Sequence, residues 1–136
     1  MGATAEAMES RYVFHVTVRL SASGRVFFDP DTFETRLYRP ADPPGEPGWL
    51  FFRDNLWRGE LSDPDHFRRL ADRAIAAEVL EVDYRAFETD EASLAALKDE
   101  IRANLDDFRS ETVPETVTKY FGSSIEVRAD SEGGES

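Results

Sequence analysis

The residues of this chain best suited to binding chemistry are a neighbouring tryptophan and arginine, Trp57 and Arg58. An indole offers a large apolar face, and a guanidinium offers a rigid fork of hydrogen-bond donors that fits carboxylates and other anions. Side by side, they could hold an anionic or planar ligand or the surface of a partner protein. We therefore take the segment made of Asn55, Leu56, Trp57, Arg58 and Glu60 as the candidate binding site.

The same segment also has a purely structural interpretation. Trp57 could close the edge of a sheet while Arg58 pairs with a carboxylate such as Glu60. An arginine placed between a tryptophan and a glycine is unusual in a loop that only needs to turn, so the structural and the functional interpretation of Trp57 and Arg58 both stay open. Residues 49–53, just upstream, are apolar at most positions, and we expect them to form a central strand that is covered on both faces.

A second candidate chemistry depends on histidine. His15 is on the polar face of the first predicted strand, where it could meet Asp83 or Glu81 from a neighbouring strand. A histidine hydrogen-bonded to a carboxylate can act in acid–base catalysis. The simpler interpretation is a histidine that is satisfied within the sheet. A small enzyme built on the His15–carboxylate pair is therefore the alternative to a non-enzymatic binding module.

Metal and cofactor chemistry has little support in the residues. Two similar stretches, residues 29–33 and 63–67, each place two aspartates around a proline, and oxygen ligands suit calcium or magnesium. Neither stretch has the glycine, the spacing or the terminal glutamate of a cation-binding loop, so both are better explained as turn and helix-cap signals. The chain has no cysteine and no phosphate-binding or nucleophile-elbow motif. We expect no metal and no cofactor.

The composition is short, acidic and poor in lysine. The 136 residues fit one domain, and 28 acidic against 16 basic residues give a formal net charge of −12. Concentrated salt screens the self-repulsion of such a chain, because the Debye length falls to about 3 Å at 1 M. We interpret the protein as halophilic and cytoplasmic; an ordinary acidic protein is the alternative. The chain has no run of basic residues that would bind nucleic acid, so we expect no nucleic-acid partner. No segment has the pattern of a signal peptide or of a membrane span, so we expect no membrane partner.

Hydropathy patterns predict an α+β fold. Alternating apolar residues indicate strands, and apolar residues three and four apart indicate helices. We expect strands at residues 12–20, 25–28, 32–38, 49–53, 80–86 and 124–128, main helices at about 64–77 and 94–108, and a short helix from Pro114 to Gly122. The economical architecture is a two-layer sandwich of a mostly antiparallel sheet of about five to six strands with two main helices on one face. Strand 49–53 is expected to pair with 32–38 and to run parallel to 80–86.

One domain is expected to span residues 11–128, between a disordered N-terminal extension at 1–10 and a disordered acidic tail at 129–136. The stripe of apolar residues along the 94–108 helix should belong to the core. If the sheet were too small to cover it, the stripe would instead be the face of a homodimer.

The run from Asn55 to Glu60 reads Asn-Leu-Trp-Arg-Gly-Glu. In an acidic chain of this length, it resembles the LWR-salt protein family of haloarchaea, which is named for its Leu-Trp-Arg motif. The resemblance covers residues 12–128. It implies an origin in salt-loving archaea and no established activity, so the partner remains an unknown protein or a small anionic ligand.

Overall fold

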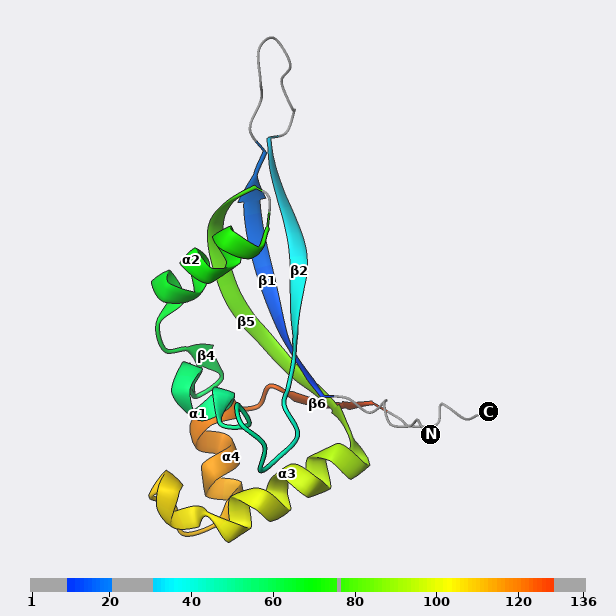
Figure 1. Cartoon of the computed structure of the whole chain (residues 1–136), viewed down its shortest axis with the longest axis vertical. Helices are drawn as coiled ribbons and strands as arrows, with labels where there is room; N and C mark the ends of the chain where they lie inside the picture. The colour runs from blue at the N-terminus through cyan, green and yellow to red at the C-terminus, as the bar shows by residue number, and fades with distance from the viewer. Residues whose placement is uncertain (1–9, 21–30, 76, 129–136) are drawn as a thin grey trace, which may run out of the picture.

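The computed structural model describes residues 10–20, 31–75 and 77–128 (Figure 1). Four strands form the main sheet in the order β2-β1-β5-β6, and two short strands form a separate hairpin. The strands are β1 Arg11–Arg19, β2 Thr32–Pro40, β3 Leu56–Trp57, β4 Glu60–Leu61, β5 Glu78–Asp90 and β6 Ile125–Arg128. The helices are α1 Phe51–Asn55, α2 Pro64–Ala74, α3 Glu91–Ala103 and α4 Val113–Phe121, with a 3-10 helix, η2, at Leu105–Phe108. The α+β class is confirmed.

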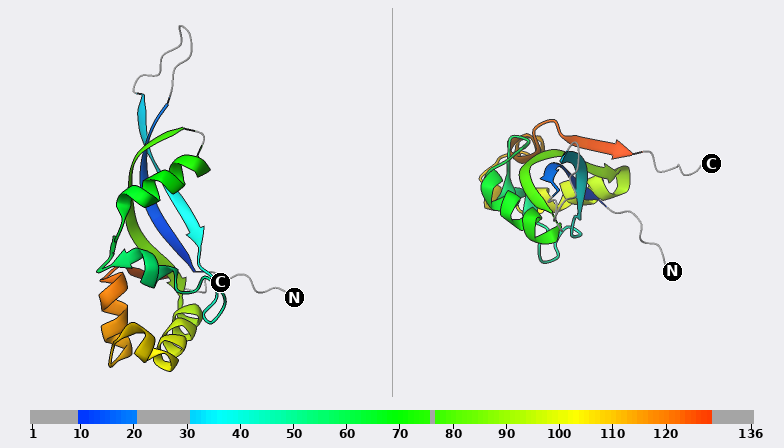
Figure 2. Two further views of the ribbon diagram at one scale, coloured as in Figure 1. Left: turned by 60° about the vertical axis from the view of Figure 1, so that its left-hand side comes forward. Right: turned by 90° about the horizontal axis from the view of Figure 1, so that it is seen from above.

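The main sheet is built around β1. This strand pairs antiparallel with both β2 and β5, and β5 in turn pairs parallel with β6, so the sheet is mixed. One side of β1 faces the core, where Phe14 and Val16 are fully buried. Helix α2 covers this side, with the Phe67 ring centre 4.9 Å from that of Phe14. Figure 2 shows α2 lying across β1 and β5, while α3 and α4 lie near the opposite end of the sheet.

Two bulges change the inner face of β5. Simple alternation predicts that Leu80 and Ala86 share the apolar face, but the register with β1 skips Leu80 and Arg85. Each extra residue shifts the alternation by one position. Val79 and Phe87 consequently face the core, with exposed fractions of 1% and 3%.

The segment at residues 49–53 is not a strand, and this prediction was wrong. It leads into helix α1, in which Phe52 is buried, and Leu56 directly after the helix is buried as well. A spacing of four residues between buried positions is helical, whereas a strand would bury residues two apart. Within the described sheet, β2 therefore pairs with β1 alone, and the strand expected to run parallel to β5 does not exist.

Helix α2 begins where the sequence predicts and ends earlier. Asp63 accepts a hydrogen bond from the backbone N–H of His66 at 3.1 Å, which caps the helix and confirms the structural interpretation of this aspartate. The helix ends at Ala74 rather than near residue 77. The three- and four-residue spacing of apolar positions predicts that Phe67, Leu70, Ala71 and Ala74 face the core. Phe67 and Ala71 are buried, whereas Leu70 and Ala74 are exposed.

The predicted helix at residues 94–108 is divided in two. Helix α3 ends at Ala103, and Asn104 donates its side-chain amide to the carbonyl of Glu100 at 2.8 Å before η2 begins. The apolar stripe of this segment belongs to the core, as expected. Leu97, Ile101 and Phe108 are buried, and the partly buried Leu94 and Leu105 pack against the core. Helix α4 ends at Phe121, and Gly122 caps its C-terminus at the predicted position.

Some predictions fall outside the described residues. These are the strand at 25–28, nearly all of the extension at 1–10 and the acidic tail at 129–136. Among the helices that the structure describes, none combines the length and the apolar character needed to cross a membrane.

Candidate functional site

The Leu-Trp-Arg segment forms the hairpin of β3 and β4, with Trp57 opposite Glu60. Its turn consists of Arg58 and Gly59, whose φ angles are 56° and 84°. Two central residues at positive φ are characteristic of a type I′ turn, which favours asparagine or glycine at these positions. The backbone conformation of Arg58 therefore costs about 1–2 kcal/mol relative to the right-handed region.

The hairpin turn is docked on the C-terminal end of α4. Arg58 donates its backbone N–H to the carbonyl of Lys119 at 2.8 Å, and Gly59 donates to the carbonyl of Tyr120 at 2.9 Å. The last carbonyls of a helix have no partners within the helix itself. The turn supplies two of the missing donors, so the motif and the helix end stabilise each other.

Two glycines make this close approach feasible. A Cβ atom on Gly59 would lie 3.0 Å from the carbonyl oxygen of Phe121, and one on Gly122 would lie 2.9 Å from that of Arg58. Both obstacles are backbone atoms, which cannot rotate away as a flexible side chain can. The glycine of the motif and the glycine that ends α4 therefore serve a single contact between segments about 60 residues apart.

The first two candidate residues hold the hairpin in place. Asn55 is the last residue of α1, and its side-chain amide donates to the carbonyl of Phe51, the first residue of that helix, at 3.0 Å. The backbone carbonyl of Asn55 accepts from the backbone N–H of Ser62 at 3.0 Å. Leu56 is 1% exposed and belongs to the core. The structure thus gives Asn55 and Leu56 roles in the fold: the Leu56 side chain is enclosed in the core, and the half-buried Asn55 side chain is bonded to α1.

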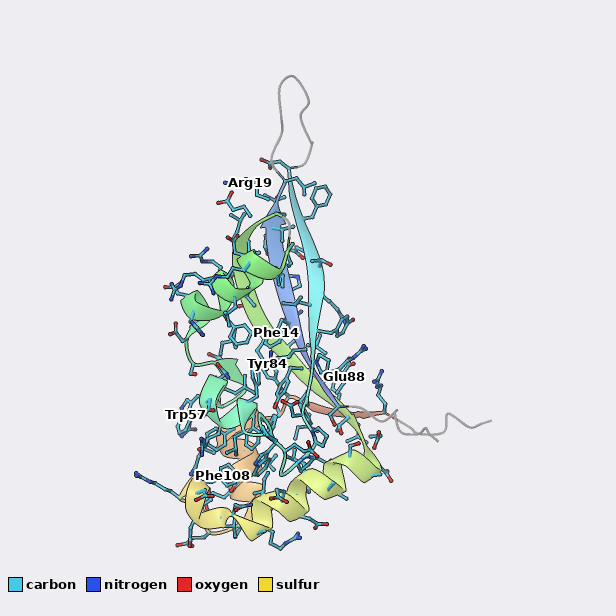
Figure 3. The ribbon with its side chains drawn as sticks, in the orientation of Figure 1. Phe14, Arg19, Trp57, Tyr84, Glu88 and Phe108 are labelled. Atoms are coloured by element: carbon cyan, nitrogen blue, oxygen red, sulfur yellow. The ribbon has the colours of Figure 1, made fainter. Side chains whose placement is uncertain are left out.

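Figure 3 shows the Trp57 side chain at the surface, away from the main sheet, and the next residue, Arg58, is exposed as well. Trp57 is 47% exposed, and one edge contact with Tyr120, at 6.0 Å between ring centres, fixes its inner side. The Arg58 guanidinium carbon lies 5.5 Å from the centre of the Trp57 ring. Among the described residues, this guanidinium makes no hydrogen bond or ion pair, so the expected structural pairing with the exposed Glu60 is not formed.

Lys119 is a supporting residue that the sequence did not reveal. Its ammonium group donates to the carbonyl of Phe108 at 2.7 Å, to that of Arg109 at 3.3 Å and to the hydroxyl of Ser110 at 3.0 Å. These bonds tie the end of η2 to α4, the helix on which the hairpin docks. The scarcity of lysine was the available signal, since a rare residue type in a composition dominated by arginine merits inspection.

A cavity of about 410 Å³ borders the hairpin, and its lining includes Gly59, Glu60 and Asp83. Tyr84 forms part of the wall, and its hydroxyl is 2.7 Å from that of Ser124. Burial raises the pKa of this phenol, against the opposing effect of the hydrogen bond. The hollow carries acidic side chains and no cation among its lining residues, so it is suited to donors rather than to anions.

His15 does not meet the carboxylates expected for it. Asp83 is its neighbour in the register of β1 and β5, but the imidazole Nε2 lies 3.0 Å from Glu34 on β2. The two side chains are 27% and 70% exposed, so the pair is at the surface. Four cavities bordered by described residues have volumes of about 380–590 Å³, and His15 lines none of them.

The fold and the site define a small α+β domain that presents an exposed tryptophan–arginine pair on a hairpin docked against a helix. The family model of the LWR-salt protein matches residues 8–131, and the chain belongs to that family. The match confirms the resemblance indicated by the Leu-Trp-Arg motif. Neither the curated proteins nor the solved structures gave a match.

Proposed function

We propose that this chain is a non-enzymatic binding module whose Leu-Trp-Arg hairpin contacts a partner protein. The observation that carries the proposal is the conformation of Arg58. Its backbone has a φ of 56°, where glycine or asparagine fits at lower cost, and its guanidinium contacts the Trp57 ring without any hydrogen bond or ion pair to a described residue. Backbone strain at a residue whose side chain is not used by the fold is a reason to infer a function for that side chain.

The exposed pair has the chemistry of an interface centre. Tryptophan and arginine are among the residues that contribute most to the affinity of protein interfaces. The Trp57 ring can be covered by an apolar surface, and the Arg58 fork can donate to a carboxylate or to backbone carbonyls of the partner. In concentrated salt, isolated charge pairs are screened, whereas the burial of an aromatic ring is not.

A protein suits this surface better than a small anionic ligand, which is the second candidate. Glu60 is exposed two residues after Arg58, and it lines the acidic cavity together with Asp83. These carboxylates would repel a free anion at short range, where salt screens charge least. A protein surface can place an acceptor on Arg58 and a donor beside Glu60 at the same time.

The hairpin is well held for binding. The two backbone hydrogen bonds to α4 and the buried Leu56 fix the turn, so that few backbone torsions need to be ordered when a partner docks. Side chains on a rigid support bind with a smaller loss of conformational entropy than those on a free loop. The acidic, lysine-poor composition supports a halophilic and cytoplasmic setting for this binding.

The proposal is tested by affinity capture from a high-salt cytosol at molar KCl. The intact chain is compared with the double variant Trp57→Ala, Arg58→Ala. The matched control is Leu70→Ala, Arg73→Ala on α2, which removes an apolar side chain that is 40% exposed and an exposed arginine from another surface. We expect one partner protein to be captured by the intact and control chains and to be lost from the hairpin variant.

Thermal unfolding of the three chains separates binding from stability. We expect the hairpin variant to keep its melting temperature within roughly 5 °C of the intact chain, since only surface contacts are removed. Equal capture by all three chains, or an equal loss in the control, would contradict a binding role for the hairpin.

A further inference from the structure

A second surface of the molecule is built for pairing, and it is independent of the hairpin. Strand β2, Thr32–Pro40, is an edge of the main sheet, and no described strand pairs with its outer side. Figure 1 shows β2 as the right-hand border of the sheet. A long edge strand presents unpaired backbone groups and is a template for another strand, and natural proteins therefore manage such edges with charge or coverage.

The ladder with β1 determines which backbone groups are free. Leu20 donates its N–H to the carbonyl of Asp31, and Ala41 donates to the carbonyl of Ser10, so hydrogen-bonded pairs lie just beyond both ends of the two strands. Bonded and non-bonded pairs alternate along an antiparallel ladder. The backbone groups that point to the free edge therefore belong to every second residue of β2, Thr32, Glu34, Arg36 and Tyr38.

The charges on this edge are complementary to those of a second copy of β2 that runs in the opposite direction. If two copies of β2 pair antiparallel about Thr35, Glu34 of each copy stands opposite Arg36 of the other. In the single chain, Glu34 has a side chain that is 70% exposed and bonds His15 through one oxygen. Arg36 is exposed and makes no ion pair with any residue that the structure describes. The second copy supplies the partner that Arg36 lacks.

The apolar residues of β2 obey the same symmetry on the inner face of the sheet. Pairing about Thr35 places Phe33 of one copy opposite Leu37 of the other, twice. Phe33 is 44% exposed, and Leu37 is only partly buried against the core. Cross-strand apolar pairs and opposite-charge pairs both stabilise an antiparallel sheet.

Charge also excludes the neighbouring registers. Two residues that face each other must either both direct their backbone groups to the free edge, as a bonded pair, or both direct them to β1, as a non-bonded pair. The register can therefore shift only by two residues at a time. Pairing about Glu34 would place two glutamates opposite each other, and pairing about Arg36 would place two arginines opposite each other. Like charges in directly opposed positions are destabilising.

We propose that two copies of this chain form a twofold dimer in which their β2 strands pair antiparallel about Thr35. The four-stranded sheets then join into one sheet of eight strands. A twofold interface requires a surface that is complementary to itself, and the register about Thr35 satisfies this for charge and for apolar contact. Because Trp57 and Arg58 are not on β2, failure of the dimer would leave the proposed binding hairpin untouched, and the reverse also holds.

The test is sedimentation velocity of the purified chain and of two single variants, Glu34→Arg and Arg36→Glu, at the lowest KCl concentration that preserves the thermal transition. Each variant places like charges in both symmetry-related pairs, and we expect the dimer to weaken about tenfold or more. An equimolar mixture of the two variants places arginines opposite glutamates again, and we expect it to form a heterodimer. The controls are Glu81→Arg and Arg85→Glu, which make the same charge changes at exposed positions of β5.

Each outcome decides the proposal. Dimers of the wild type and the controls, monomers of both single variants and a dimer of their mixture would support it. A wild-type chain that sediments only as a 15.4 kDa monomer at the highest concentration would overturn it. It would equally be overturned if the single variants dimerised like the wild type or if their mixture remained monomeric.

Discussion

Substitution of Gly59 by alanine perturbs the contact on which the position of the hairpin depends. Gly59 has a φ of 84°, and an alanine in this region costs about 1–2 kcal/mol. The new Cβ would also lie 3.0 Å from the carbonyl oxygen of Phe121, so that the hairpin and α4 must move apart. This weakens the two hydrogen bonds donated by the turn, each worth about 1 kcal/mol net. We expect a total loss of roughly 2–4 kcal/mol in the free energy of unfolding.

The matched control is Gly45→Ala. Gly45 has a similar φ of 87°, but a Cβ there would meet only the flexible Glu100 side chain, at 3.5 Å. We expect this variant to lose only the conformational part, about 1–2 kcal/mol. Urea unfolding at one fixed KCl concentration measures both losses, and an unchanged slope against urea confirms that only stability has changed. Equal losses for the two variants would refute the docking of the hairpin on α4.

Three further predictions concern the core, the tyrosines and salt. Leu56→Ala should lower the free energy of unfolding by about 2–5 kcal/mol, because this side chain is 1% exposed. Trp57→Ala should lower it by less than about 1.5 kcal/mol, because the indole is 47% exposed. Similar losses for the two variants in thermal unfolding would contradict the division of the motif into a buried part and an exposed part. Burial raises the pKa of Tyr12 and of Tyr84 above the ordinary value of 10.0, so stability should be constant below that pH and should fall above it, by about 1.4 kcal/mol per pH unit for each tyrosine. Tyr12→Phe should roughly halve this slope in urea titrations from pH 9 to 11, and an unaltered slope would show that Tyr12 is not responsible. The melting temperature should fall as KCl is reduced from molar to physiological concentration, because self-repulsion within the acidic chain is then less screened; a flat profile would remove the physical basis of the halophilic interpretation.

The parts of the fold that follow local rules could be predicted from the sequence. The alternation along β1, the proline after Asp63 and the glycine after α4 each identify an element from neighbouring residues alone. The strand prediction for residues 49–53 was wrong because four consecutive apolar residues show neither a two-residue nor a helical period. Nothing local therefore distinguishes a strand from one turn of helix. The bulges at Leu80 and Arg85 depend on the register with β1, which no local pattern records.

The position of the candidate site could be predicted from the sequence. Which of its residues are exposed and which hold the hairpin in place could not. Trp57 and Arg58 were identified by residue type, and Leu56 and Asn55 were grouped with them because they are adjacent. Only the fold shows that the first pair is exposed and the second holds the hairpin. Gly59 and Gly122 each indicate a turn, but their shared contact joins segments that are distant in sequence, and a positive φ at Arg58 has no sequence signal of its own.

Partner binding by an Arg58→Gly chain tests the role of the hairpin most directly. Glycine relieves the strain at a φ of 56° and preserves the backbone hydrogen bond to α4. We expect the free energy of unfolding to be unchanged or higher by up to about 1 kcal/mol. At the same time, affinity for the captured partner, measured by calorimetry at molar KCl, should fall about tenfold or more, as expected for loss of a central interface arginine. A variant that is equally stable and binds the partner with unchanged affinity would contradict the proposed function.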